Sequence, residues 1–310
     1  MSLPYFSESD VRGLLSYEAL IPAIRQALID LTAGRVQQPL RQILEVPLEE
    51  GKTGWFATMP VVAGDVMGVK TVTFYPTNAA HGLHTHMAVI ELLSRTTGEP
   101  LALMDGRLIT EMRTAAVSAV AFAALKPADA TTFGIIGSGV QARSHVHALV
   151  LLWPELKEIR ISGRKAENAA RLAAELVAEY PGIQIHATEI EAAAAADVLL
   201  VATSSPTPVL EARWLPAQSL ILTVGATGKT VREIDAATML SSTVIADSRA
   251  SVERESGDVI LSGATVHCEI GEILLGEIAA PQNQRVLFKS VGLAIEDLVA
   301  ADLVWKAANK

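Results

Sequence analysis

The stretch FGIIGSGVQARSHVHALV, from Phe133 to Val150, determines the fold expected for this chain. An apolar run leads into Gly137, Gly139 and Ala142, and a helical segment follows. In such a turn the first Gly permits a tight bend, the second lets the backbone approach a pyrophosphate, and a small third residue lets helix and strand pack closely. N–H groups at the helix amino terminus are then available to phosphates. The stretch predicts a dinucleotide-binding turn, with cofactor contacts expected at Gly137, Ser138, Gly139, Val140 and Gln141.

The chain around this turn alternates between two kinds of segment. From Thr131 onward, helical stretches separate the short β-rich runs TTFGIIG, EIRISG, IQIHA, DVLLVAT, SLILTVG and STVIAD. A parallel sheet with crossover helices requires this alternation. We therefore predict an α/β Rossmann dinucleotide-binding domain over residues 113–291.

The end of the second predicted strand indicates which dinucleotide binds. A carboxylate at that position accepts hydrogen bonds from the ribose hydroxyls of NAD, whereas an Arg nearby attracts the 2′-phosphate of NADP. Here the strand ends in Ser162, Gly163 and Arg164. We predict that Ser162 and Arg164 bind the phosphate, that NADPH is preferred and that NADH is possible. The alternative is that Arg164 is a solvated side chain at a helix start.

The first 112 residues differ from the rest in composition. A helix is expected from about Ser16 to Ala33, and residues 41–102 are broken by Gly and Pro and carry the β-rich runs GVKTVTFYP and THMAVIELL. This pattern indicates an α+β domain built on an antiparallel sheet. A buried helix after Thr110 is expected to join the domains, and the tail from Ser290 has helical spacing and can return to the first domain.

Bulk composition excludes several classes of function. With 310 residues, half of them hydrophobic and 19% charged, the chain can form a compact core. The net charge of −9 disfavours non-specific nucleic-acid binding, which needs a basic face. Cys268 is the only cysteine, so internal disulfides and Cys-based metal sites are excluded and a reducing cytoplasm is expected. No signal segment and no run of apolar residues of membrane-spanning length is present, so no membrane association is predicted.

Three basic residues ahead of the dinucleotide turn are candidates for binding an anionic substrate. They are Arg41, Lys70 and Arg113. The planar fork of Arg suits a carboxylate, and Lys can act as an acid when burial or another cation lowers its pKa. Most Arg and Lys side chains are solvated surface charges, but Lys70 lies within an apolar β-run.

At these residues the sequence resembles a known family. The segment from Gly68 to Ala119, the later IIGSGVQARSH and SGDVILSGA, and the closing FKSVGLAIEDL are similar to the ornithine cyclodeaminase/mu-crystallin family. The resemblance implies a Rossmann domain plus a split α+β substrate-binding domain, residues 1–112 with 292–310, that forms a homodimer interface. It also implies a substrate that carries an α-carboxylate.

The resemblance assigns roles by motif position. Arg41, Lys70 and Arg113 match positions that bind the carboxylate, with Lys70 close to the reacting carbon and catalytic. Thr85 matches a position on the substrate side. The remaining matches are cofactor neighbours, with Thr114 at a phosphate: Thr114, Thr203, Ser204, Val224 and Ser290.

Departures from the family pattern indicate which branch of the family this chain resembles most. Where the cyclodeaminase branch has an Asp that activates an amine or water, this chain has Thr227, and Ala57 replaces an acidic residue. Neither can accept a proton as a carboxylate does. The REID run ending at Asp235 is closer to the mu-crystallin and imine-reductase branch.

These departures favour one reaction. We predict NADPH-dependent reduction of a cyclic ketimine, 1-pyrroline-2-carboxylate or 1-piperideine-2-carboxylate, to proline or pipecolate. Three alternatives remain open: ornithine cyclodeaminase, an amino-acid dehydrogenase, and a non-catalytic NADPH-binding protein.

A group of histidines resembles a metal site. His81, His84 and His86 lie in HGLHTH, but strand alternation places only His84 and His86 on one face. No metal is predicted, and His86 can line the substrate pocket.

Overall fold

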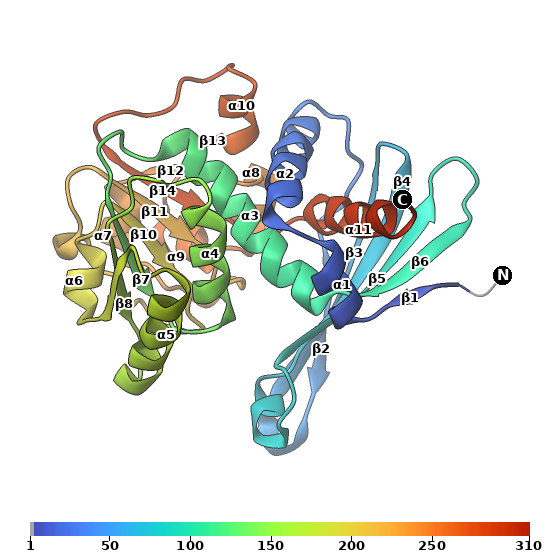
Figure 1. The fold of residues 1–310 in the computed structure, drawn as a ribbon, viewed down its shortest axis with the longest axis horizontal. Coiled ribbons are helices and arrows are strands. Elements are labelled where there is room, and N and C mark those ends of the chain that lie inside the picture. Colours follow the sequence, from blue (N-terminus) through green and yellow to red (C-terminus); the bar gives the residue numbers. More distant parts are fainter. Residues whose placement is uncertain (1–2) are drawn as a thin grey trace. The chain divides into compact units, whose positions relative to one another are not determined.

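The computed structural model describes residues 3–310, and the chain divides into two compact units. Unit 1 consists of the chain up to Arg113 together with Leu293–Lys310, and unit 2 is Thr114–Gly292. The predicted breaks, after residues 112 and 291, each lie one residue earlier. Each unit has its own sheet (Figure 1).

Unit 1 is built on a six-stranded sheet with the order β1-β6-β5-β4-β3-β2. Neighbouring strands are antiparallel except β1, which lies parallel to β6. Short connections between β3 and β4 and between β5 and β6 make the antiparallel hairpins that the Gly-broken sequence predicted. The strands are β1 Tyr5–Phe6, β2 Gln42–Pro47, β3 Thr53–Ala63, β4 Val66–Phe74, β5 His86–Ser94 and β6 Pro100–Asp105.

Helices cover one face of this sheet. The carboxyl-terminal helix α11 packs on α2 and on strands β3, β4 and β5, so the tail returns to the first unit (Figure 1). Ser7 and Ser16 begin α1 and α2 by accepting hydrogen bonds from backbone N–H groups of the first turn. The elements are α1 Glu8–Leu14, α2 Tyr17–Thr32 and α11 Ala294–Ala308, with short 3₁₀ turns at Glu49–Gly51 and Pro76–His81.

The opposite face of the six-stranded sheet carries exposed apolar side chains. Leu44 of β2 and Met87 of β5 lie on one cross-strand row, and Val89 is two residues beyond Met87 on the same face. Their exposed fractions are 62%, 41% and 44%. Their chain neighbours, such as Ala88 and Ile90, point into the core and are buried.

Unit 2 contains an eight-stranded sheet with the order β13-β12-β14-β11-β10-β7-β8-β9, in which all pairs are parallel. Every residue of β10 and β11 is buried, as expected for parallel strands covered on both faces. The predicted α/β Rossmann class is confirmed. The strands are β7 Thr132–Ile136, β8 Glu158–Ser162, β9 Gln184–Ala187, β10 Val198–Val201, β11 Ser219–Thr223, β12 Thr243–Ala246, β13 Val266–Glu269 and β14 Arg285–Lys289.

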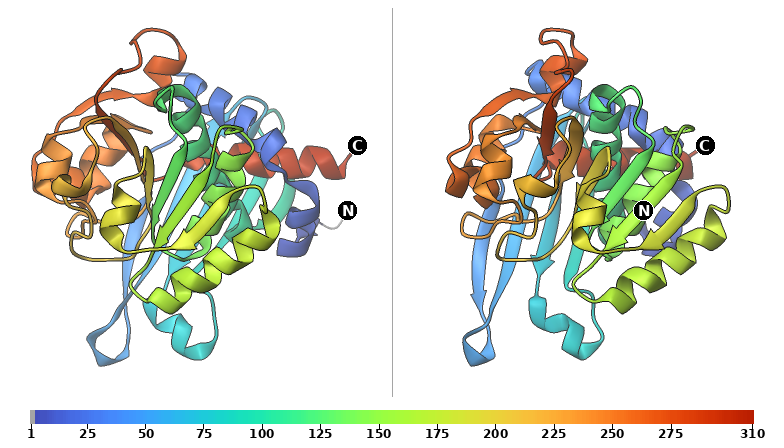
Figure 2. Two further views of the ribbon diagram at one scale, coloured as in Figure 1. Left: turned by 60° about the vertical axis from the view of Figure 1, so that its left-hand side comes forward. Right: turned by 90° about the vertical axis from the view of Figure 1, so that its left-hand side faces the viewer.

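The crossover helices of unit 2 follow the strands in sequence. In Figure 2 the yellow-green helix α5 runs along β8 and β9, which it contacts. The alanine-rich tract forms the short helix α6 and then enters β10. The helices are α4 Val140–Val150, α5 Ala166–Glu179, α6 Ile190–Ala194, α7 Ala236–Leu240, α8 Arg249–Glu255, α9 Gly257–Ser262 and α10 Ile270–Leu274, with a 3₁₀ turn at Ala212–Trp214.

Helix α3, Arg107–Leu125, spans the boundary between the units. Its 19 residues are long and apolar enough to cross a membrane by length and composition alone, but most of the apolar stretch is buried inside the protein. Ala115 and Ala119 are fully buried, and Phe122 packs on Trp153 with 4.8 Å between ring centroids. The helix is therefore a core helix.

A buried histidine connects α3 to α4 within unit 2. His145 is fully buried, with Nδ1 2.7 Å from the carbonyl oxygen of Gln141 and Nε2 2.8 Å from the Ser118 hydroxyl. A neutral ring that donates from Nδ1 and accepts at Nε2 satisfies both contacts. Burial lowers the pKa of His145 to about 4.

This shift predicts loss of stability in acid. Between the unfolded pKa near 6.5 and the folded pKa near 4, the unfolded chain binds a proton that folded His145 does not, so stability falls as the pH falls. The loss is about 3 kcal/mol at the acid end. In urea unfolding across this range, His145→Gln is expected to flatten the dependence on pH, and exposed His267→Gln is not. Equal slopes in the two variants would contradict this.

Candidate active site

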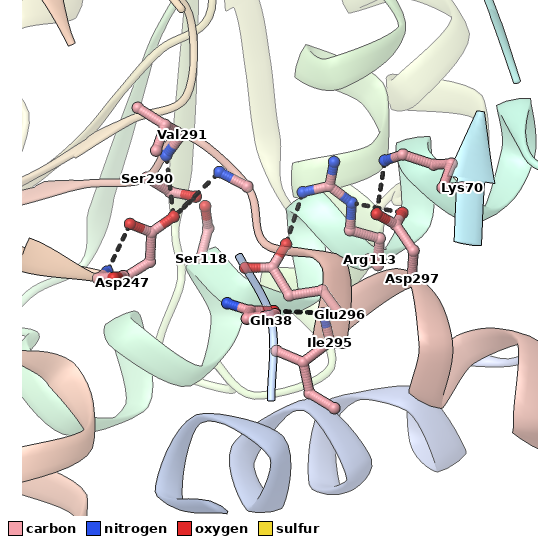
Figure 3. Close-up of polar contacts among 12 residues, drawn as sticks. Gln38, Lys70, Arg113, Ser118, Asp247, Ser290, Val291, Ile295, Glu296 and Asp297 are labelled. Carbon is pink, nitrogen blue, oxygen red and sulfur yellow. Dashed lines mark hydrogen bonds and ion pairs between the residues drawn. The ribbon is translucent and has the colours of Figure 1, made fainter. Parts of the chain in front are cut away.

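Two cations and a carboxylate meet in unit 1. Figure 3 shows Lys70, Arg113 and Asp297 pointing toward one another. Lys70 Nζ lies 2.5 Å from Asp297 Oδ2, and Arg113 Nε donates to Asp297 Oδ1 at 3.1 Å. Arg113 Nη1 also donates to Glu296 Oε2 at 2.6 Å. Lys70 and Arg113 are 3% and 6% exposed, so both charges are nearly removed from water.

Local structure explains why these side chains meet. Lys70 on β4 pairs with Met59 on β3 and Ile90 on β5, and strand alternation turns its side chain to the helix-covered face. The first turn of α11 supplies Asp297. The N–H groups of a first helical turn need acceptors outside the helix. Ile295 N donates to Gln38 Oε1 at 2.9 Å, which fixes the start of α11 (Figure 3).

Burial and neighbouring charges have opposing effects on the pKa values of the cluster. Burial, Arg113 and Arg41 lower the pKa of Lys70 and Asp297 raises it, and together these effects place the pKa at about 8. Burial alone would raise the pKa of Asp297, but Arg113 and Lys70 hold it below its ordinary value. The charge of Arg41 also acts on both Lys70 and Asp297. Guanidinium and ammonium groups gathered in this way suit a small carboxylate.

One histidine of the HGLHTH segment, His86, is influenced by the charges of this cluster. Burial, together with the charges of Lys70 and Arg113, lowers the pKa of His86 to about 4, so the ring is neutral at neutral pH. His81 and His84 are exposed. Thr85 is half-buried, and its carbonyl accepts a hydrogen bond from Tyr75 N at 2.8 Å. Within residues 3–310, no three His, Cys, Asp or Glu side chains form a group able to hold a metal ion.

The dinucleotide turn in unit 2 has a backbone geometry that requires glycine at Gly137 and leaves open space at Gly139. Gly137 has φ of 126°, and a Cβ there would lie 2.3 Å from the Ala202 carbonyl oxygen. Gly139 caps the amino terminus of α4, and a Cβ there would meet nothing within 4 Å. Open space above Gly139 and exposed Val140 fit the approach of a pyrophosphate to the helix amino terminus.

The end of β8 lies beside this turn. Gly137 N donates to Ser162 O at 2.8 Å, and a Cβ on Gly163 would lie 3.0 Å from Ser138 Oγ. Ser162 is buried, whereas Arg164 is exposed in the connection to α5. Arg164 thus belongs to a loop that touches the turn, at the strand end where an NAD site has a carboxylate residue.

Of the remaining predicted cofactor residues, three follow β10 and β11 at the carboxyl edge of the parallel sheet, and the others lie in buried or half-buried positions in unit 2. Thr203 and Ser204 follow β10, and Val224 follows β11, so they share the carboxyl edge of the parallel sheet with Gly137. Ser290 is 2% exposed, and its hydroxyl donates to Asp247 Oδ2 at 2.8 Å (Figure 3). Gln141 is half-buried in the first turn of α4, and Thr114 is buried on α3.

A buried charge network supports this sheet edge. Lys289 Nζ donates to Asp258 Oδ2 and to Gly225 O, each at 2.7 Å. Asp258 Oδ1 accepts from Glu233 N at 2.8 Å, and Glu233 Oε1 accepts from Thr203 N at 2.5 Å. Burial raises the pKa of Glu233 to about 7, although Lys289 lowers it in part. The network holds the loops after β10 and β11 in place.

Sequence reasoning missed several of these residues. Glu296 and Asp297 were not predicted as site residues, although an acidic pair interrupts the apolar run GLAIEDLVA. Lys289 likewise follows the apolar residues of RVLF. A charge within an otherwise buried segment signals a partner, because an isolated buried charge is too costly to retain. That signal was available, but it does not identify the partner.

Comparison with known proteins gives matches over nearly the whole chain. The model of the ornithine cyclodeaminase/mu-crystallin family matches residues 5–310. The ketimine reductase mu-crystallin of Rattus norvegicus is 37% identical over 307 residues, which cover 97% of this chain and 96% of that protein. The Delta(1)-pyrroline-2-carboxylate/Delta(1)-piperideine-2-carboxylate reductase of Azospirillum brasilense is 34% identical over 301 residues, covering 96% and 94%.

A solved structure matches the complete fold. The Thermococcus litoralis Delta(1)-pyrroline-2-carboxylate reductase, in complex with NADH and L-proline, superposes with a TM-score of 0.93 at 36% identity. The match covers 99% of this chain and 98% of that one.

Proposed function

Because the chain belongs to the ornithine cyclodeaminase/mu-crystallin family, we propose that it is an NADPH-dependent reductase of cyclic ketimine carboxylates. The substrates are 1-pyrroline-2-carboxylate or 1-piperideine-2-carboxylate, and the products are proline or pipecolate. The relatives named as reductases of such compounds support an oxidoreductase. The observation that carries the proposal is the pair of buried cations Lys70 and Arg113, whose site is also influenced by the charge of half-buried Arg41, because such cationic groups suit one small carboxylate.

Each side chain of the cluster has a task in this reaction. Arg113 and Arg41 bind the substrate carboxylate, because guanidinium groups form paired hydrogen bonds with carboxylate oxygens. Lys70 holds a proton at Nζ and gives it to the imine nitrogen. When bound, NADPH supplies the hydride that reduces the imine carbon, so the C=N double bond becomes a C–N single bond with one new hydrogen on each atom.

The cofactor preference rests on this chain's own residues. The Thermococcus litoralis relative was solved with NADH, so the preference does not follow from family membership. Arg164 lies where the adenosine ribose is expected, and no acidic residue occupies residues 162–165 at that strand end. A guanidinium there attracts the 2′-phosphate of NADPH and leaves NADH as a weaker cofactor.

The principal alternative is a cyclodeaminase that releases ammonia. Its branch relies on acidic residues where this chain has exposed Thr227 and buried Ala57. The discriminating assay supplies each imine with NADPH, an open-chain α-keto acid plus ammonia with NADPH, and, separately, ornithine with NAD. We expect stoichiometric NADPH oxidation with an imine and no ammonia from ornithine. Ammonia release without net change in nicotinamide absorbance favours the cyclodeaminase, and turnover only with open-chain substrates favours an amino-acid dehydrogenase.

We also propose that the protein is a homodimer through the exposed face of the six-stranded sheet. The apolar side chains of Leu44, Met87 and Val89 support this assignment, because apolar surface of this kind is stabilised by burial against a second copy.

Val89→Asp is expected to give a monomer, because the interface would bury a charge without a partner. Val177→Asp on α5 is the matched control, since Val177 is 43% exposed and Val89 is 44% exposed. Analytical ultracentrifugation distinguishes the species. If Val89→Asp stays dimeric, the interface lies elsewhere.

A further inference from the structure

Asp297 contacts both cations that the proposed reaction uses. Its Oδ2 lies 2.5 Å from Lys70 Nζ, and its Oδ1 accepts from Arg113 Nε at 3.1 Å. Asp297 is 1% exposed, so water does not screen these interactions. The start of α11 is held by the hydrogen bond from Ile295 N to Gln38 Oε1, which fixes the carboxylate relative to both partners.

We propose that Asp297 is a positioning residue that keeps Lys70 as an ammonium ion and fixes its direction, so that Lys70 can protonate the imine nitrogen. This inference rests on the proposed function, and it assigns a role to a residue that does not itself contact the substrate.

The charges around Lys70 make it depend on Asp297. Arg113 on α3 and Arg41 before β2 disfavour a third positive charge, and His86 on β5 is neutral. Burial also favours the neutral amine. Asp297 on α11 opposes these effects, and the resulting pKa of Lys70 is about 8. Without the Asp297 carboxylate, burial and the two Arg charges would act unopposed by it, and Lys70 would lose its proton at a lower pH.

Glu296 provides a matched control on the same helix turn. It is fully buried and accepts from Arg113 Nη1 at 2.6 Å, whereas Asp297 pairs with Lys70 as well as with Arg113. Glu296→Gln and Asp297→Asn each remove one buried negative charge with little change in shape. They therefore separate the specific pairing with Lys70 from a general loss of negative charge at the site.

The test is the pH dependence of kcat/KM with one imine and saturating NADPH, from about pH 6 to about pH 10. The wild type is expected to lose activity on the alkaline side with a midpoint near 8, as Lys70 loses its proton. Asp297→Asn is expected to lower this midpoint by about one pH unit or more, and to cut activity about tenfold at pH 8 relative to its own acid plateau. The pKa of the imine is measured separately, and the titration of the substrate is divided out of every profile before the midpoints are compared.

Two further variants test whether the alkaline loss of activity arises from Lys70. Glu296→Gln is expected to lower kcat/KM through Arg113 and to keep the wild-type midpoint. Lys70→Arg carries a charge that is not lost in this range, so its alkaline limb near pH 8 is expected to vanish. A limb that persists in Lys70→Arg overturns the inference, and this result does not require Asp297→Asn to fold.

The outcomes distinguish the inference from the proposed function. If the wild type reduces the imine and Asp297→Asn keeps its midpoint, the inference is wrong and the function stands. If the wild type reduces neither imine, the function is wrong, and the Lys70 titration is then followed by NMR of lysine-labelled protein, with Lys70→Arg identifying the resonance. An Asp297→Asn midpoint equal to the wild type in that titration also overturns the inference.

Discussion

Arg164→Asp is expected to reverse the cofactor preference, lowering kcat/KM for NADPH about 100-fold or more and changing that for NADH several-fold at most. The substitution removes charge-assisted hydrogen bonds to the 2′-phosphate and places a carboxylate against a second negative group. The same carboxylate can accept hydrogen bonds from the ribose hydroxyls of NADH, so that cofactor is not penalised. Initial rates with both cofactors at one fixed imine concentration give the ratio.

Lys165→Asp is the control for general charge effects. Lys165 is the next residue in the same loop and is also exposed, so its substitution changes the net charge by the same amount. We expect a much smaller effect on NADPH than with Arg164→Asp. If Arg164→Asp weakens both cofactors equally, the guanidinium does not recognise the 2′-phosphate.

Lys70→Met is expected to lower kcat about 10²-fold to 10⁴-fold, because loss of a positioned proton donor costs a reaction of this kind that much. The Kd for NADPH is expected to stay unchanged, because the dinucleotide turn belongs to unit 2 and Lys70 to unit 1. Met fills a similar volume, and thermal unfolding reports any loss of stability from leaving Asp297 with Arg113 alone.

Single-turnover rates and cofactor fluorescence titrations measure the two quantities separately. A Lys70→Met protein that retains kcat would remove Lys70 from the chemistry. A protein that loses NADPH affinity together with kcat would indicate a folding defect rather than a catalytic one.

The dinucleotide turn could be predicted because its chemistry is local. Gly137, Gly139 and Ala142 lie within six residues, and each acts on its own backbone or on the strand beside it. The structure places Gly137 at a positive φ against Ala202, as a tight strand-to-helix turn demands. Alternation of short β-rich runs with helical stretches likewise predicted β7 to β12, of which β10 and β11 are buried at every residue. The family resemblance is confirmed by a match over residues 5–310.

In unit 2, two strands were not among the predicted runs. β13 has the sequence VHCE, with a polar or charged residue at every second position, and β14 has charged residues at both ends. Lys289 at the end of β14 is fully buried against Asp258, which lies on α9. Only that tertiary pairing allows the charge to occupy a buried strand position.

The acidic residues of the site could not be predicted as site residues, because their partners lie far away in the sequence. Arg113 and Asp297 are separated by 184 positions, so no pattern near either residue shows that they meet. The helical spacing of the tail predicted α11, but the burial of Glu296 and Asp297 depends on how that helix packs on β3, β4 and β5. The acidic side chains of the site were therefore missed while its basic side chains, drawn from family motifs, were named.

Transfer of deuterium from NADPH that carries deuterium at both C4 positions of the nicotinamide tests the central claim most directly. With 1-pyrroline-2-carboxylate as acceptor, mass spectrometry is predicted to find proline carrying a single deuterium at C2, formed in equal amount with NADP⁺. Unlabelled proline, or an imine left unchanged beside bound and unoxidised NADPH, would contradict the assignment of this protein as a ketimine reductase.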